Sequence, residues 1–126
     1  MIATRWRPAA LWALLIEALV LWPNPPEVPQ GWTVVWFDFL KIDRLAHVTL
    51  FGVLAVLVLR ALVAERRPMW IAFVAGAAFG ACTEVQQHFV PTRSMEFGDF
   101  LADAAGTAIG LAIFATWALT RREFSR

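Results

Sequence analysis

Four stretches of this chain are apolar over lengths that approach the thickness of a lipid bilayer. A helix rises about 1.5 Å per residue, so a hydrocarbon core of about 30 Å takes about 20 residues. Hydrophobic residues make up 60% of the 126 positions, a share above that of ordinary soluble domains. We therefore predict an all-α membrane protein, a single domain over residues 1–126. Its four transmembrane helices form a bundle and span residues 6–22, 45–64, 69–89 and 100–120.

The segment between the first two predicted spans contains a loop and a short helix. Pro23 to Gln30 includes four prolines, each of which removes a backbone donor and restricts the preceding residue, so this part is a loop. Over residues 31–41, apolar residues such as Trp32 and Trp36 recur at helical spacing. A helix of this length is too short to cross a bilayer, so we predict that it lies in the outward-facing membrane interface.

The basic residues predict the orientation of the chain. Most of them lie on one side of a four-span arrangement, and the positive-inside bias assigns that side to the cytoplasm. These residues are Arg5, Arg7, Arg66, Arg67, Arg121, Arg122 and Arg126. We predict a multi-pass protein of the cytoplasmic membrane with both termini in the cytoplasm and the lipid bilayer as its partner. A net charge of +1 provides no basic surface for nucleic acid, so we predict no nucleic-acid partner.

Several polar side chains lie inside or beside the apolar segments, toward the outward end of the predicted bundle. Glu84 and Gln87 are near the end of the third predicted span, Asp99 and Asp103 are at the start of the fourth, and Arg93 lies between them. Such side chains are costly in a membrane, so each needs a partner or a function. We predict that they form one candidate binding site.

The second predicted span contributes to the same site. Asp43 and His47 are four residues apart on one helix face at the outward end of this span. Three helices then carry polar groups at the same depth, near the outer lipid headgroups. Glu17 joins them as a further acid if the first helix packs inward.

Small residues continue the polar faces of the third and fourth spans. Gly76 and Gly80 share a face with Glu84, and Gly106 and Gly110 share a face with Asp103. Small residues allow helix backbones to approach closely in membranes. We therefore predict that the two glycine faces pack against each other across the hairpin of the third and fourth helices.

The four acids of the predicted site outnumber its positive groups, which are Arg93, Arg44 and a protonated His47. Either some acids are protonated or a cation bridges two of them. Carboxylates and one imidazole suit a divalent metal, but the sequence has no compact ligand motif such as H-E-x-x-H. The sequence therefore predicts no metal site and no cofactor.

The polar pattern resembles the signature of the VanZ-like family of small bacterial integral membrane proteins. The resemblance covers roughly residues 40–115. It rests on Glu84, Gln87, Phe89, Arg93, Asp99, Gly106 and Gly110, with Asp43 and His47 upstream. At Asp103 the family more often has Asn, so the charge of the site differs at this position. The resemblance implies a membrane protein related to one that lowers susceptibility to teicoplanin.

Two interpretations of the polar cluster stay open. In one, it is a hydrogen-bonded lock between helices, with Arg93 tied to Asp99 or Glu84. In the other, it binds or modulates an envelope lipid or a lipid-linked cell-wall precursor at the outer leaflet. One alternative to a binding protein is an enzyme acting on a lipid headgroup, with His47 and a carboxylate as acid and base and Arg93 stabilising negative charge. The other alternative is a purely structural subunit.

Overall fold

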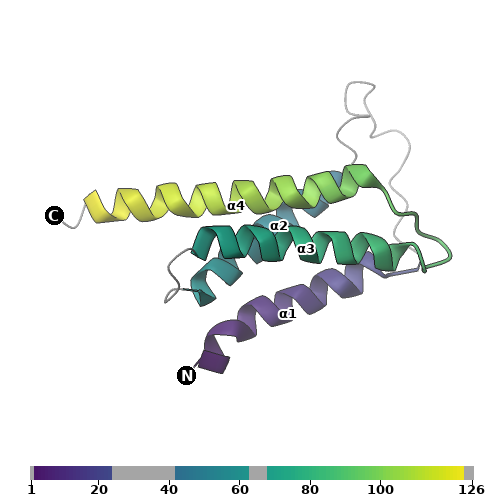
Figure 1. The fold of residues 1–126 in the computed structure, drawn as a ribbon, viewed down its shortest axis with the longest axis horizontal. Helices are drawn as coiled ribbons and strands as arrows, with labels where there is room; N and C mark the ends of the chain where they lie inside the picture. The colour runs from purple at the N-terminus through teal and green to yellow at the C-terminus, as the bar shows by residue number, and fades with distance from the viewer. Residues whose placement is uncertain (1, 24–41, 63–67, 124–126) are drawn as a thin grey trace.

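A computed structural model describes residues 2–23, 42–62 and 68–123, with side chains placed at residues 4–23, 44–62 and 68–120. The described residues form four α-helices and no β-strand, which confirms the predicted all-α class. The helices are α1 (Ile2–Val20), α2 (Ile42–Ala61), α3 (Pro68–Gln87) and α4 (Phe97–Glu123). Successive helices run in opposite directions, so the start of α1 and the end of α4 lie at the same end of the bundle (Figure 1).

Three helices are long and apolar enough to span a membrane. Within the described part of the chain these segments are Arg44–Ala61, Pro68–Gln87 and Phe97–Thr120, close to the second, third and fourth predicted spans. The first predicted span corresponds to α1, which is not among them because Arg5, Arg7 and Glu17 place three charges in its 19 residues. The short helix predicted at residues 31–41 lies outside the described residues.

Local sequence sets where α3 and α4 begin. Pro68 is the first residue of α3, a position where the fixed φ of proline suits the helix and its missing N–H costs nothing. The carbonyl oxygen of Glu96 accepts hydrogen bonds from the amides of Asp99 (3.0 Å) and Phe100 (3.3 Å) and so starts α4. Asp99 lies in the first turn, where its negative charge complements the helix dipole.

Apolar side chains fill the bundle at two places. One cluster joins α2, α3 and α4, and the other joins α1 to α2 through Ile16, Val20, Phe51 and Leu54. The ring of Phe51 is fully buried and packs against Phe79 of α3, with ring centroids 5.8 Å apart. These contacts hold the end of α1 beside the polar ends of α2 and α3.

The backbones of α2 and α4 approach each other closely. A Cβ atom added to Gly106 would lie 2.7 Å from Cα of Val48, and one added to Gly110 would lie 2.8 Å from Cα of Gly52. Both contacts involve α2 backbone, which cannot move aside as a side chain can. The prediction that this glycine face packs on α3 is therefore wrong, because α4 turns it toward α2.

The glycines of α3 do face α4, as predicted, but they meet side chains. An added Cβ at Gly76 would lie 2.8 Å from the side chain of Thr107, and one at Gly80 would lie 2.9 Å from the side chain of Asp103. The missing side chains of α3 thus make room for two polar side chains of α4. Gly80 in particular provides the space that the carboxylate of Asp103 occupies.

Gly106→Ala is expected to lower the free energy of unfolding by about 1–3 kcal/mol, because the new methyl group pushes α4 away from the backbone of Val48. Ala108→Leu, on the exposed side of the same helix, is the matched control. Unfolding in detergent by increasing SDS measures both. Equal stability of the two variants would contradict the close α2–α4 packing.

Candidate functional site

The polar residues predicted from three helices do come together. They lie at the end of the bundle where α2 and α4 begin and α3 ends, opposite the start of α1 and the end of α4 (Figure 1). Five of the seven predicted site residues are buried there: His47, Glu84, Gln87, Asp99 and Asp103. The side chain of Asp43 is outside the described residues, and Arg93 lies at the edge, partly exposed.

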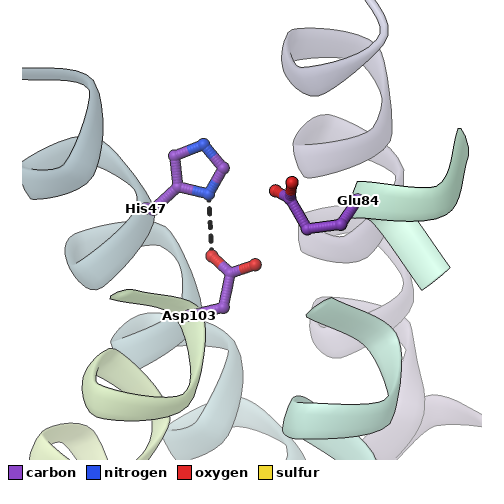
Figure 2. Close-up of side chains that lie close together, drawn as sticks. All are labelled: His47, Glu84 and Asp103. Atoms are coloured by element: carbon purple, nitrogen blue, oxygen red, sulfur yellow. Dashed lines mark hydrogen bonds and ion pairs between the residues drawn. The ribbon is translucent and has the colours of Figure 1, made fainter. Parts of the chain in front are cut away.

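The centre of the site is formed by His47, Glu84 and Asp103, which point toward one another from α2, α3 and α4 (Figure 2). Nδ1 of His47 is hydrogen-bonded to Oδ1 of Asp103 at 2.8 Å. One potential ligand atom from each of the three residues lies within 4.8 Å of the other two, so these residues could hold a metal ion. The hydroxyl of neighbouring Thr107 donates to the backbone carbonyl oxygen of Asp103 at 2.8 Å and not to its carboxylate.

Glu84 is held by groups that follow it in the chain. The backbone N–H of Glu96 donates to Oε2 of Glu84 at 3.0 Å. The amide nitrogen of Gln87 faces either the carbonyl oxygen of Val20 at 3.4 Å or, with the amide rotated, Oε1 of Glu84 at 3.1 Å. We assign the second orientation, because it gives a shorter bond to a charged acceptor. Gln87 thus positions the carboxylate of Glu84.

Asp99 is paired with Arg44, not with Arg93. Nε of Arg44 lies 3.3 Å from Oδ1 of Asp99, and its Nη2 lies 3.6 Å from Oε2 of Glu96. The guanidinium therefore joins the start of α2 to the start of α4 above the buried centre. Arg44 is a quarter exposed and Glu96 38% exposed, so this pair of residues forms the rim of the site.

Arg93 has a different role from the one predicted. Its guanidinium donates to the carbonyl oxygens of Leu19 (3.2 Å) and Trp22 (3.3 Å), at the carboxyl end of α1. Thr92 also donates to the carbonyl oxygen of Pro23. The predicted ties of Arg93 to Asp99 or Glu84 are therefore wrong, because the loop after α3 directs this side chain toward backbone carbonyls at the carboxyl end of α1.

Glu17 also lies apart from the centre of the site. With the amide of Gln86 oriented to donate, its nitrogen is 2.8 Å from Oε2 of Glu17, which links α1 to α3.

Sequence reasoning included Arg44 in the charge balance but not in the site, and it missed Glu96. The spacing of Glu96, Asp99 and Asp103 on successive helical turns is the signal that could have identified Glu96.

Comparison with known proteins identifies a family. Residues 6–119 match the family model described as VanZ/LLP1. Searches of curated proteins and of solved structures found no match. The matched residues include α2 and α3 in full, most of α1 and α4, and every residue of the site.

A double-mutant cycle distinguishes the two arginines. Arg44→Gln and Asp99→Asn should show a coupling energy of about 1–3 kcal/mol in unfolding, because each removes the partner of the other. Arg93→Gln and Asp99→Asn should be coupled by less than about 0.5 kcal/mol, since Arg93 bonds to backbone of α1. A larger coupling for the Arg93 pair would contradict the assigned ion pair.

Proposed function

The chain belongs to the VanZ/LLP1 family, and we propose that it is an integral protein of the cytoplasmic membrane that binds an envelope lipid or a lipid-linked cell-wall precursor. The ligand would be held by its phosphate-bearing headgroup at the outer leaflet. Through this ligand the protein would affect susceptibility to teicoplanin. The observation that carries the proposal is the buried polar cluster at one end of helices that are apolar enough for lipid.

The lock interpretation accounts less well for this cluster. A lock between helices requires that every buried polar atom has a partner, because unpaired groups are costly in an apolar interior. Oδ2 of Asp103 has no hydrogen-bond partner in the described structure, although the residue is fully buried. An incomplete network of this kind is typical of a site that receives a ligand.

The rim offers groups that a headgroup can reach. Arg44 is partly exposed above the cluster, and a guanidinium binds phosphate through parallel N–H donors. Its present partners, Asp99 and Glu96, are carboxylates that would share or release it when a phosphate binds. We propose that Arg44 takes the role that the sequence suggested for Arg93.

An apolar groove beside the site suits an acyl chain. It has a volume of about 390 Å³ and runs along the seam of α2 and α4, where the glycines leave space. Val48 and Gly106 lie at the end nearest the polar cluster, since they follow His47 and Asp103 closely in the chain. A lipid with its headgroup at Arg44 would place one chain along this groove.

A second candidate function is an enzyme acting on the same headgroup. The hydrogen bond from His47 to Asp103 fixes the imidazole in one orientation, which is what an acid or base in proton transfer needs. Arg44 would then stabilise negative charge in the reaction. Chemical change of the recovered lipid distinguishes this enzyme from a binding protein.

The proposed orientation places the polar site outside. Arg5 and Arg7 of α1, Arg60 of α2, and Arg121 and Arg122 of α4 lie toward the opposite end of the bundle, and the positive-inside bias assigns that end to the cytoplasm. In this arrangement α1 also crosses the membrane, with its charges near the cytoplasmic end except for Glu17. The site then opens toward the outer leaflet.

Lipid recovery tests the proposed function. Native mass spectrometry of the protein, purified in mild detergent and supplied with phospholipid or lipid-linked precursor, should detect a bound lipid. Arg44→Gln should weaken its binding about tenfold or more, through loss of charged hydrogen bonds. Val53→Trp, which fills the groove, should also weaken it. Val74→Trp is the control, since Val74 is exposed on α3 and does not line the groove.

In a teicoplanin-susceptible host, wild-type protein should change growth in the drug, and Arg44→Gln should lose that effect while still accumulating in the membrane. Binding that is equal in wild type, Arg44→Gln and Val53→Trp would contradict the proposed site. No bound lipid together with full membrane accumulation would favour a purely structural subunit.

Reporter fusions test the orientation. Fusions after residues 30, 66, 95 and 126 should report outside, inside, outside and inside in turn. A cytoplasmic signal at residue 95 would place the site on the cytoplasmic side and contradict the proposed orientation. A cytoplasmic signal at residue 30 alone would mean that α1 does not cross the membrane.

A further inference from the structure

The three central side chains have the arrangement of metal ligands. His47, Glu84 and Asp103 come from three helices and face one shared space (Figure 2). Their ligand atoms lie within 4.8 Å of one another. Ligands of one ion are about 3–4 Å apart when metal–ligand bonds are about 2.1 Å long. Small side-chain rotations therefore bring all three to one ion.

One buried carboxylate oxygen of this cluster has no hydrogen-bond partner in the described part of the chain. Oδ1 of Asp103 is bonded to His47, but Oδ2 has no partner among the described residues, and the residue is 0% exposed. Buried carboxylate oxygens are rarely left without a hydrogen bond or a cation. The absence of a side chain at Gly80 makes room for this oxygen, because an added Cβ would lie 2.9 Å from it.

The charges of the cluster favour a cation as its ligand. Glu84 and Asp103 are both buried, and the residue that faces both of them among the described side chains and can carry a positive charge is His47. Arg44 is committed to Asp99 and Glu96 at the rim. A divalent cation would balance the two carboxylates while the imidazole stays neutral, and neutral imidazole is the form that binds metal.

We propose that His47, Glu84 and Asp103 bind a divalent transition-metal ion, Zn²⁺ or Mn²⁺. One imidazole and two carboxylates suit these ions, whereas Mg²⁺ and Ca²⁺ favour ligand sets made of oxygen alone. Three protein ligands leave at least one position on the ion open. This inference goes beyond lipid binding and does not depend on it, although a bound cation would also attract an anionic headgroup.

Metal titration of the full chain tests the proposal. The protein is purified in detergent, stripped with a chelator, and titrated with Zn²⁺ or Mn²⁺ in excess Mg²⁺. Wild type should bind one ion per chain. Asp103→Asn, which keeps the shape and a bond to His47, and Glu84→Gln should each lower the affinity by about 100-fold or more. Pulsed EPR of the Mn²⁺ sample should show coupling to an imidazole nitrogen, and His47→Gln should abolish it.

Glu17→Gln is the matched control, because it removes an acid that lies outside the cluster and should leave the affinity unchanged. Absence of binding by wild type, or an affinity in Asp103→Asn and Glu84→Gln that is unchanged from wild type, would overturn the proposal. If one of these variants does not fold, the other gives the answer. The two proposals fail separately: lipid recovered without metal uptake contradicts only the metal site, and metal uptake without lipid contradicts only the proposed function.

Discussion

The burial of two carboxylates against a single imidazole, inside helices apolar enough for lipid, is the constraint on which this structure depends. Charges in such surroundings need close partners, because no water is available to solvate them. The surroundings supply some of these partners: the N–H of Glu96 and the amide of Gln87 hold Glu84, and His47 holds one oxygen of Asp103. What they leave unpaired defines what the site can bind.

Packing and chemistry are coupled through α2 and α4. The glycines that bring these two helices together lie one to two turns from the bond between His47 and Asp103, so the backbone contact sets how far apart the imidazole and the carboxylate are. The same glycines leave room for the apolar groove along the side of the α2–α4 seam that faces away from α3. On the inner side, Gly80 of α3 gives the carboxylate its space. Small residues thus shape both the polar site and its apolar neighbour.

Helical periodicity predicted more of the site than of its connections. It correctly placed His47, Glu84 and Asp103 at one depth, because the period fixes which face of a helix a residue occupies. It did not predict which neighbour that face meets, and so Gly106 was assigned to α3 instead of α2. Nor did it predict that Arg44 would pair with Asp99, because the reach of a long side chain beside a loop depends on the tertiary structure. A metal site was not predicted because its ligands come from three separate helices.

Anomalous diffraction from crystals grown with Zn²⁺ tests the central claim most directly, because it locates the ion and its ligands at once. We expect one strong peak between α2, α3 and α4, about 2 Å from an imidazole nitrogen of His47 and from carboxylate oxygens of Glu84 and Asp103. A map with no peak there, in which Oδ2 of Asp103 is hydrogen-bonded to Glu84, would show a closed network and contradict the account.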